Sequence, residues 1–396
     1  MLEFPASGSA VELRHLRSFV AVAEELNFGR AAERLYITQP ALSRQITGLE
    51  QAIGCELLRR STRRVELTLA GEALLERARP LLRDADDAVL AVQSLSGEIV
   101  ARVAQLWQPV GDQGDLEQQR AAYESLLAHF DVPPGVQVRP VNAGGVPALV
   151  VAEDPAAPPG VLYLHGGGFV MGSAFGVRPL AGALALAAGR GVLTADYRLA
   201  PEHPFPAALD DAHAAYEWMV ARTGAPSQLV VAGDSAGAGL ALALLLRLRD
   251  AGLPLPAGAT LFCPIADLQA TTIGPDKDDL TSRVIGDFWR GCVDAYLAGH
   301  PPDDPLVSPV RGSLSGLPPL LIQVGTGDIL RGESQNVADR ARHDGVEAQL
   351  ELYPVDAHIF HHFWSFLPEA TNALDAAGRF IREVLQDTRA ATSQIG

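Results

Sequence analysis

Cysteine is scarce in this sequence, with three residues in 396, at positions 55, 263 and 292. Thiols so few and so widely spaced exclude a disulfide framework and a cysteine-rich zinc site, and they favour a reducing compartment. A secretory signal is also lacking, because the first ten residues, MLEFPASGSA, contain neither a basic segment nor an apolar run. We therefore expect a cytoplasmic protein.

An uninterrupted apolar run of membrane-spanning length is lacking as well. Residues 229–248, LVVAGDSAGAGLALALLLRL, have the necessary length, but Gly233, Asp234 and Ser235 divide them. A short run rich in β-branched residues precedes the break, and a longer run of leucine and alanine follows it. This pattern predicts a strand, a turn and a helix, and no association with a membrane.

Length and charge indicate more than one domain. A chain of 396 residues exceeds the roughly 100–200 residues of one ordinary domain. The net charge of −16 argues against a nucleic-acid-binding protein as a whole. Residues 14–68, however, hold nine arginines against six glutamates, a net of +3, whereas residues 101–396 hold 19 basic and 33 acidic groups, a net of −14. This asymmetry indicates two parts with different tasks.

Residues 13–68 have the pattern of three short helices followed by a hairpin. Apolar residues recur with helical spacing over 13–23, a second helix fits 29–35, and a third begins at Pro40, with Thr38 or Gln39 as its cap. The residues of the third helix expected to face inward are Leu42, Ile46, Leu49 and Ile53. Residues 59–68, RRSTRRVELT, predict a basic hairpin able to reach phosphates. This is the arrangement of a helix-turn-helix, whose second helix enters the major groove of DNA.

The run LRHLRSFVAVAEELNFGRAAERLYITQPALSRQITGLEQAIGCELLRRSTRRVELTLAG resembles the winged helix-turn-helix of LysR-type transcriptional regulators over residues 11–68. The resemblance implies binding of double-stranded DNA through a recognition helix at residues 39–52. The base and phosphate contacts that it implies are Thr38, Gln39, Pro40, Ser43, Arg44, Thr47, Arg63 and Arg64. The alternative is a three-helix packing module whose arginines are merely solvated.

A long helix is predicted after Gly71. Its apolar residues follow one another at alternating steps of four and three, at Leu74, Ala78, Leu81, Ala85, Ala88, Val92 and Leu95. Such a heptad seam calls for a partner helix, and LysR-type proteins dimerise through a linker helix at this place. We therefore expect residues 69–106 to form a linker and the protein to be a homodimer or a higher homo-oligomer. A helix that packs on its own chain is the alternative, and Pro80 would bend either one.

The effector-binding domain that LysR-type regulators carry next is not found, and residues 107–389 have a different pattern. Short β-rich runs alternate with helical runs, which predicts an α/β fold with a mainly parallel sheet covered on both faces. The candidate strands are residues 147–152, 160–165, 191–196, 228–233, 258–263, 319–324 and 347–352.

Two glycine-rich motifs follow predicted strands in this region. Residues 233–237 read G-x-S-x-G between a strand and a helix, the context of a nucleophile elbow that presents Ser235 on a sharp turn. Residues 165–168 read HGGG after another strand, where backbone N–H groups can face a developing negative charge. With the N–H after the nucleophile, the expected oxyanion hole is Gly166, Gly167, Gly168 and Ala236. Taken alone, HGGG could be a simple glycine-rich turn.

A serine nucleophile needs a base that is oriented by an acid. In this fold the order is Ser, Asp or Glu, then His, which selects Asp328 and His358, each after a predicted strand. Asp356 is the second candidate for the acid, and His361 and His362 are rival bases. The three histidines could also suggest a metal, but no ordered set of further ligands accompanies them. We expect neither a metal nor an organic cofactor.

Over about residues 115–385 the sequence resembles the hormone-sensitive-lipase-like esterases, bacterial family IV. The resemblance rests on HGGGF, DYRLAPEHPFPAALDD, GDSAGAG, DPLVSP and the loops of Asp328 and His358. It implies an α/β-hydrolase fold, a helical cap near residues 88–131 and 279–298, and a bracing role for Asp196 and Arg198. The cap residues that could line an acyl pocket, or form ordinary cap core, are Leu280, Ile285, Phe288, Trp289 and Tyr296.

The combined prediction is a serine carboxylesterase for short acyl esters that is carried on a DNA-binding module. The alternative is a transcriptional regulator in which the hydrolase fold senses, or degrades, a small inducer. The complete set of catalytic residues favours the enzyme, and the recognition helix with its heptad seam favours DNA binding.

Overall fold

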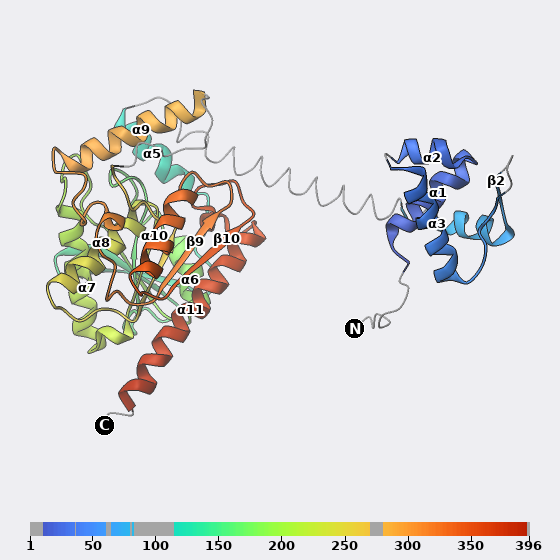
Figure 1. Ribbon diagram of the computed structural model, residues 1–396. Helices are drawn as coiled ribbons and strands as arrows, with labels where there is room; N and C mark the ends of the chain where they lie inside the picture. Colours follow the sequence, from blue (N-terminus) through green and yellow to red (C-terminus); the bar gives the residue numbers. More distant parts are fainter. Residues whose placement is uncertain are drawn as a thin grey trace. The chain divides into compact units, whose positions relative to one another are not determined.

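The computed structural model describes residues 11–35, 37–60, 65–79, 81–82, 115–269 and 280–393. The chain divides into two units, Met1–Glu98 and Ile99–Gly396, which we describe separately (Figure 1). The division falls within the predicted linker of residues 69–106.

The described part of the first unit begins with three short helices and a hairpin, and a further helical stretch follows them. Its elements are α1 (Leu13–Glu25), α2 (Phe28–Arg34), α3 (Gln39–Ile53), β1 (Leu58–Arg60) and β2 (Val65–Leu67), and the two strands are antiparallel. Phe19, Val22, Leu42, Ile46 and Leu49 are fully buried between the helices, as the helical spacing of the apolar residues predicts. The Glu50 carboxylate accepts hydrogen bonds from the N–H groups of residues 57 and 58, so α3 is fastened to the hairpin.

The prediction that Ile53 faces inward is wrong, since this side chain is 39% exposed. Ile53 is the last residue of α3, and Gly54 turns the chain away in the left-handed region at φ 80°. Residues 69–79 and 81–82 are helical, and Leu74, Ala78 and Leu82 pack on the core of their own unit. Pro80 and the heptad positions from residue 85 onward lie outside the described residues, so dimerisation through this seam remains a prediction.

The second unit is built on an eight-stranded sheet. Its strands are β3 (Gln137–Ala143), β4 (Val146–Ala152), β5 (Val161–Leu164), β6 (Val192–Ala195), β7 (Val230–Asp234), β8 (Gly258–Phe262), β9 (Leu320–Gly325) and β10 (Ala348–Tyr353). Their order is β10-β9-β8-β7-β5-β6-β4-β3, and every pairing is parallel except those that involve β4. The α/β class with a mainly parallel sheet is thus confirmed. Strand β3 was not predicted, because it is a polar, mostly exposed edge strand that contains Pro140.

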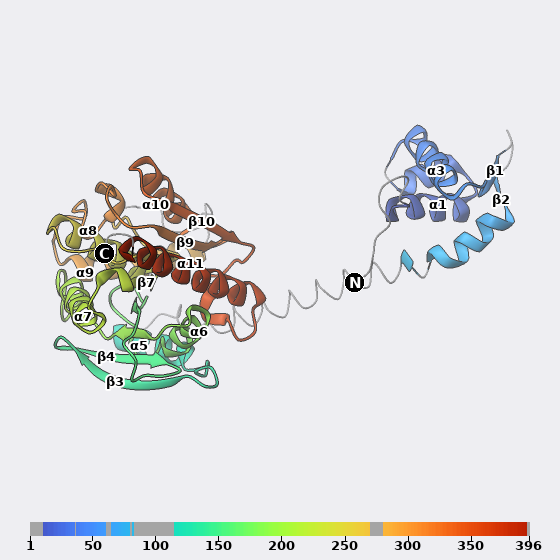
Figure 2. The same ribbon diagram turned by 90° about the horizontal axis from the view of Figure 1, so that it is seen from below.

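Helices cover both faces of the sheet. They are α5 (Leu116–Leu127), α6 (Arg178–Ala188), α7 (Ala207–Thr223), α8 (Ala236–Asp250), α9 (Leu280–Leu297), α10 (Arg331–His343) and α11 (Pro368–Ser393), with short 3-10 turns η1 (Pro226–Gln228), η2 (Pro309–Arg311) and η3 (Phe360–Phe363). The crossover through α6 moves along the sheet in one direction, and those through α7, α8 and α10 move in the other. Because such crossovers are right-handed, α6 and its neighbour α11 lie on one face and α7, α8 and α10 on the opposite face (Figure 2).

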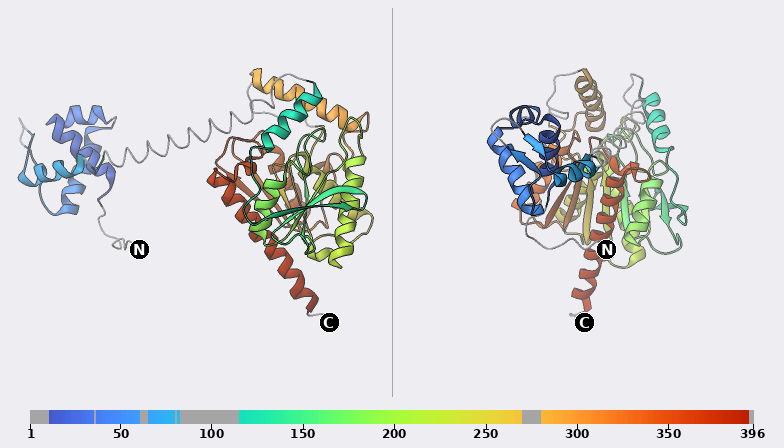
Figure 3. Two further views of the ribbon diagram at one scale, coloured as in Figure 1. Left: turned by 180° about the vertical axis from the view of Figure 1, so that it is seen from behind. Right: turned by 90° about the vertical axis from the view of Figure 1, so that its right-hand side faces the viewer.

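Helices α5 and α9 both lie at the same end of this unit, as the view from behind also shows (Figure 3). None of the helices in the described ranges is both long and apolar enough to cross a membrane. The stretch from residue 229 to 248 is instead divided into β7, a turn at Ser235 and α8, as predicted. The loops after the parallel strands converge at the carboxyl edge of the sheet, where ligand sites of open α/β folds are found.

Candidate active site

Ser235 occupies a strained turn between β7 and α8. Its backbone has φ 52° and ψ −120°, a conformation that side-chain-bearing residues keep only when the surroundings enforce it. A β-carbon at Gly237 would lie 2.0 Å from the Leu164 carbonyl oxygen, and one at Gly233 would lie 2.5 Å from the Gly237 carbonyl oxygen. Glycine is therefore required on both sides of the serine, and the turn has the sharp strand-to-helix geometry that the G-x-S-x-G motif predicts.

Three side chains form a hydrogen-bonded row at this turn. His358 Nε2 lies 3.0 Å from Ser235 Oγ, and His358 Nδ1 lies 3.1 Å from both carboxylate oxygens of Asp328. Asp328 follows β9 and His358 follows β10, so three loops at one sheet edge supply the three groups. The serine is less open than an exposed elbow would be, because it is 5% exposed.

The charges in this row support one protonation pattern. Burial acts to raise the pKa of Asp328, but the His358 charge and the hydrogen bonds from His358, Leu330 and Cys263 hold that pKa below its ordinary value. Burial acts to lower the pKa of His358, but the Asp328 carboxylate beside it leaves that pKa raised. Asp328 thus stays ionised and accepts a hydrogen bond from the Nδ1–H group of His358, which leaves Nε2 as the acceptor that faces Ser235.

The rival groups lie elsewhere. Asp356 is exposed and makes none of the hydrogen bonds described for His358. His361 is fully buried between Phe262 and Phe360, with ring centroids 4.1 Å from each, and its Nε2–H donates to Gln323 Oε1 at 3.2 Å. Burial lowers the pKa of His361 to about 3, so it is neutral. His362 Nε2 lies 3.8 Å from Asp234 Oδ2.

The HGGG segment forms a turn that only glycine accommodates. Gly167 has φ 116° and Gly168 has φ 62°, and a β-carbon at Gly167 would lie 2.3 Å from the Met171 carbonyl oxygen. Gly166 N–H donates to Asp234 Oδ1 at 3.0 Å, so this N–H is already used. We therefore withdraw Gly166 from the expected oxyanion hole and retain Gly167, Gly168 and Ala236, the last being the first residue of α8.

Comparison with known proteins decides the family. Residues 161–362 match the alpha/beta hydrolase fold family, and residues 13–72 match the bacterial regulatory helix-turn-helix proteins of the lysR family. An acetyl-hydrolase of Streptomyces hygroscopicus is 41% identical over 278 residues, covering 68% of this chain and 90% of the relative. The chain belongs to the α/β hydrolases. It is a carboxylic ester hydrolase with a LysR-family helix-turn-helix before it.

Other relatives are esterases as well. An esterase of Acinetobacter venetianus is 34% identical over 263 residues, covering 66% of this chain and 87% of the relative. A crystal structure of an esterase from the bacterial hormone-sensitive lipase family superposes with a TM-score of 0.66 at 36% identity, covering 72% of this chain and 98% of that one. The esterase EstE5, in crystals soaked with p-nitrophenyl butyrate, superposes with a TM-score of 0.66 at 37% identity, covering 73% of this chain and 99% of that one.

Several buried polar groups that the sequence analysis missed brace the HGGG turn of this esterase. Asp234 accepts from Tyr163 Oη at 2.7 Å as well as from Gly166 N–H. Burial acts to raise the pKa of Asp234, but His362, Tyr163 and His165 hold it below its ordinary value. His165 stacks on Tyr197 at 4.2 Å between centroids, and Tyr197 Oη donates to the His165 carbonyl oxygen at 2.7 Å. His165, Asp234 and Tyr197 lie within the quoted motifs, but their pairing has no local signal, because the partners come from separate strands.

Helix α5 is joined to the end of the HGGG turn through Arg120. The Arg120 guanidinium donates to the carbonyl oxygens of Val170 at 2.7 Å and Ala200 at 2.9 Å, and to both carboxylate oxygens of Glu202 at 2.7 Å. The expected braces are also present, since Arg198 pairs with Asp211 and the Asp196 carboxylate accepts from the N–H of residue 174.

Helix α9 contacts the same turn from the cap. A β-carbon at Gly168 would lie 3.1 Å from Cys292 Sγ, and Phe169 stacks on Tyr296 with centroids 3.9 Å apart. Trp289 and Tyr296 belong to the buried core and Phe288 packs against it. The side chains of Leu280 and Ile285 lie outside the described residues. An acyl pocket made of these five residues remains a prediction.

One group of possible metal ligands occurs among the described residues. Cys263 Sγ and the ligand atoms of Asp328 and His358 lie within 4.8 Å of one another. A thiol must lose its proton to bind a metal, and burial together with the Asp328 charge raises the pKa of Cys263 well above its ordinary value. The chemistry of this set therefore fits a protonated thiol that donates to Asp328 better than it fits a metal centre.

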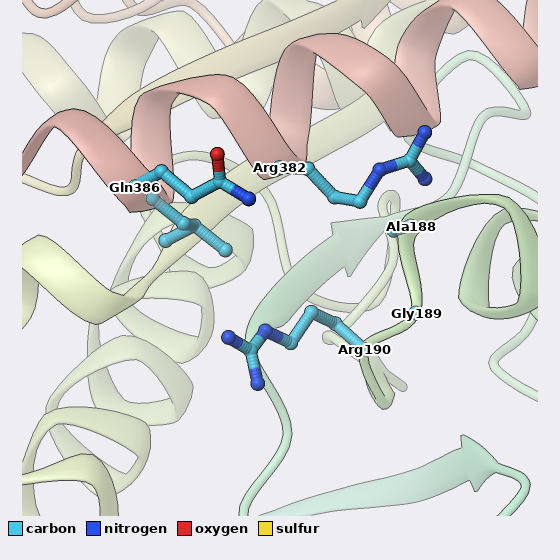
Figure 4. Close-up of a pocket in the computed structure, with 6 residues that line it drawn as sticks. Ala188, Gly189, Arg190, Arg382 and Gln386 are labelled. Carbon is cyan, nitrogen blue, oxygen red and sulfur yellow. The ribbon is translucent and has the colours of Figure 1, made fainter.

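A pocket on the same unit lies away from the three aligned side chains. It is lined by Ala188, Gly189, Arg190, Arg382, Leu385 and Gln386, where α6 ends and α11 passes (Figure 4). Arg382 donates to the carbonyl oxygen of Ala187, and a cation at a helix carboxyl end is favourable. The chain leaves this end of α6 to enter β6, so the pocket lies at the amino edge of the sheet, opposite the loops of Ser235.

The outer side of α3 carries the residues expected to contact DNA. Thr38, Gln39, Pro40, Arg44 and Thr47 are exposed and Ser43 is half-buried, whereas Arg63 and Arg64 lie outside the described residues. Arg44 Nε donates to the Pro40 carbonyl oxygen at 3.4 Å, and Thr47 Oγ1 donates to that of Ser43 at 3.0 Å. The polar side of α3 is thus opposite its buried side, as a recognition helix requires.

Proposed function

We propose that this hydrolase is a serine carboxylesterase for short acyl esters, with Ser235 as nucleophile, His358 as general base and acid, and Asp328 as the group that orients His358. The observation that carries the proposal is the row of contacts at 3.0 and 3.1 Å on a strained turn between β7 and α8. Such a row activates an alcohol that is otherwise too weak a nucleophile at neutral pH.

The reaction proceeds in two halves. Ser235 Oγ attacks the ester carbonyl carbon while His358 Nε2 accepts the hydroxyl proton, and the proton then passes to the leaving alkoxide as the ester C–O bond breaks. An acyl-serine and a free alcohol result. Water attacks the acyl group in the second half, again with His358 as base, and releases the carboxylic acid with Ser235 restored. Neither a metal nor an organic cofactor takes part in these steps.

The backbone N–H groups of Gly167, Gly168 and Ala236 would stabilise the oxygen anion of each tetrahedral intermediate. Ala236 begins α8, whose amino end favours negative charge. The next residue, Gly237, lies directly against the carbonyl oxygens of Leu164 and His165, where the HGGG segment starts. Donors that are already in place lose no free energy in reorganising when the charge develops. The Asp234 carboxylate supports the arrangement because it holds Gly166 N–H and Tyr163.

The relatives support short acyl groups as the substrate class. One relative is named an acetyl-hydrolase. The crystals of another, the esterase EstE5, were soaked with p-nitrophenyl butyrate. Helix α9 places Trp289 and Cys292 within 4 Å of where a side chain at Gly168 would begin. This close approach of the cap to the HGGG turn favours small acyl chains over long ones.

A fluorophosphonate ester tests the proposal directly. Attack by Ser235 on phosphorus should displace fluoride and leave a stable phosphonyl group, because the tetrahedral product resembles the intermediate of ester hydrolysis. Peptide mass analysis should place the label on Ser235, and boiling the protein before treatment should prevent labelling. Labelling of another serine, with Ser235 unmodified and esterase activity lost, would contradict the assignment.

We further propose that the first unit binds double-stranded DNA as a homodimer, through Thr38, Gln39, Pro40, Ser43, Arg44 and Thr47 together with Arg63 and Arg64. The match to the lysR family and the exposed polar side of α3 support this role. Residues 14–68 also carry a net charge of +3 within an acidic chain. Because bacterial chromosomes lie in the cytoplasm, binding of chromosomal DNA would place this protein there.

Replacement of Arg44 by alanine should weaken DNA binding by about 10-fold or more, since one arginine contact to a base or phosphate contributes about 1–3 kcal/mol. Binding of a duplex from the region upstream of the gene should be measured by fluorescence anisotropy over a range of salt concentrations. Wild-type affinity should fall steeply as salt rises. Arg222→Ala, which changes an exposed arginine of the hydrolase unit, is the matched control; equal affinities for all three proteins would contradict the contact.

The same assay examines the regulatory alternative. If ester binding and DNA binding are coupled, a slowly hydrolysed ester must change DNA affinity by the same factor by which DNA changes ester affinity. Absence of both changes would leave two independent activities on one chain.

A further inference from the structure

One buried carboxylate takes no part in the reaction described above. Glu333 lies on the first turn of α10 and is 9% exposed. Its Oε2 atom accepts hydrogen bonds from the backbone N–H groups of Ala266 at 2.7 Å and Asp267 at 3.1 Å. Both residues belong to the segment that follows β8, so the Glu333 side chain links the start of α10 to that segment at the carboxyl edge of the sheet.

That segment holds the backbone of Ser235. Ser235 N–H donates to the Phe262 carbonyl oxygen at 2.8 Å, and Ile265 N–H donates to the Ser235 carbonyl oxygen at 3.1 Å. A β-carbon at Gly239 would lie 2.0 Å from the Ile265 carbonyl oxygen, so the segment also lies directly against the first turn of α8. Because Ser235 has a strained conformation, it depends on these contacts to keep it.

The helix that carries Glu333 begins at the loop of Asp328. Leu330 N–H donates to Asp328 Oδ1 at 2.8 Å, and Arg331 N–H donates to the Asp328 carbonyl oxygen at 3.1 Å. Glu333 follows within the same turn of helix. Its carboxylate therefore connects the start of α10, which contacts Asp328, with the segment after β8, which contacts Ser235.

Burying this carboxylate is costly. Its Oε1 atom has no hydrogen-bond partner among the described residues. Burial raises the pKa of Glu333 to about 7, although the N–H groups of Ala266 and Asp267 favour its ionised form. The Asp267 carboxylate adds to the rise in pKa and is itself paired with Arg311 at 2.8 and 2.9 Å. Buried carboxylates are ordinarily fully hydrogen-bonded or paired with a cation. Exceptions such as Glu333 are expected mainly at functional sites.

We propose that Glu333 is a positioning residue for ester hydrolysis, which sets the distance between the Asp328–His358 pair and Ser235 by tying the start of α10 to the segment after β8. The proposal rests on the roles given above to those three residues. Loss of the tie would let the segment and the elbow shift relative to His358. A shift of about 1 Å between reacting groups can lower a rate roughly 100-fold.

The test compares Glu333→Ala, Glu333→Gln and Glu333→Asp with the wild type on p-nitrophenyl acetate. Each kcat is divided by the number of reactive serines, titrated with a fluorophosphonate. In Glu333→Ala, kcat per reactive serine should fall about 10- to 100-fold with KM changed less than threefold. Glu333→Gln should recover most of the rate, since an amide oxygen accepts the same two bonds. Glu333→Asp should not recover the rate, because its side chain is shorter and cannot reach both N–H groups. This variant replaces Glu333→Ala in the test if the alanine variant does not fold.

Gln335→Ala, at an exposed position of the same helix, is the control and should behave as the wild type. A Glu333→Ala or Glu333→Asp protein with a normal kcat per reactive serine, and only a lower unfolding temperature, would overturn the proposal, since a purely structural role predicts that result. A glutamine variant as slow as alanine would also overturn it. Ser235→Ala is assayed in parallel: if that variant still hydrolyses the ester, the proposed nucleophile is wrong rather than the positioning role.

Discussion

Replacing Ser235 with alanine is expected to reduce kcat for p-nitrophenyl acetate by roughly 10⁴-fold or more. The substitution removes the hydroxyl oxygen that lies 3.0 Å from His358 Nε2 and that would attack the ester, while the N–H groups of the HGGG turn and of Ala236 remain. Some catalysis above the rate in water should persist, because these donors still stabilise the oxyanion. Steady-state hydrolysis followed at the absorbance of p-nitrophenolate measures the effect.

Two checks make this result decisive. Ser315→Ala changes an exposed serine of the same unit and should leave kcat unchanged. Far-ultraviolet circular dichroism should show that Ser235→Ala keeps its helices and strands. A properly folded Ser235→Ala protein that retained more than a few per cent of wild-type kcat would rule out Ser235 as the nucleophile.

Replacing Asp328 with asparagine is expected to lower kcat by roughly 10⁴-fold. Asparagine is nearly the same size, but its amide can direct an N–H toward His358 Nδ1, so that the imidazole carries its proton on Nε2. That nitrogen could then no longer accept the proton of Ser235. The loss should appear in kcat rather than in KM, since Asp328 is fully buried and His358 lies between it and the serine.

The pH profile of this variant supplies a second measurement. Burial acts to lower the pKa of His358 and the Asp328 charge acts to raise it, with a raised pKa as the net result in the wild type. Removing the charge should lower the pKa, so the acid limb of kcat/KM, where His358 becomes protonated and inactive as a base, should move to lower pH. An acid limb that did not move would show that Asp328 does not interact with the titrating base.

Asp356→Asn is the matched control, because Asp356 was the rival for the role of acid and lies two residues from His358 in the sequence. Its exposed carboxylate should be dispensable, with kcat within about twofold of the wild type. If Asp356→Asn were the inactive variant and Asp328→Asn the active one, the acid would have to be reassigned.

Elements with a strong local signal could be predicted from the sequence. Strands β5, β7 and β9 are buried along their whole length and are mostly apolar, whereas β3 is polar and exposed and gave no comparable signal. The elbow could be predicted because a sharp turn needs glycine within two residues of the serine. The error at Ile53 arose because the apolar period continued one step past the point where Gly54 ends α3.

The partners of the site could be predicted only in part. The order of Ser, Asp and His along the chain selected Asp328 and His358, but it did not distinguish Asp328 from Asp356 by itself. Gly166 matched the HGGG motif, yet its N–H is used by Asp234, which lies 68 positions away. No motif predicted the contacts of Arg120 or Glu333, because their partners are distant in the sequence. The partners of Arg120 are 50 to 82 positions away, and those of Glu333 are 66 and 67 positions away.

The amino-acid sequence by itself determined that one chain carries a helix-turn-helix and a hydrolase, because periodicity, glycines and turns act between near neighbours. Only the tertiary structure decided which of three histidines faces Ser235 and which carboxylate faces that histidine. Parallel strands bring the loops at their carboxyl ends together regardless of sequence distance. Burial then sets the charge of each group, leaving His361 neutral between aromatic rings and Asp328 ionised beside His358.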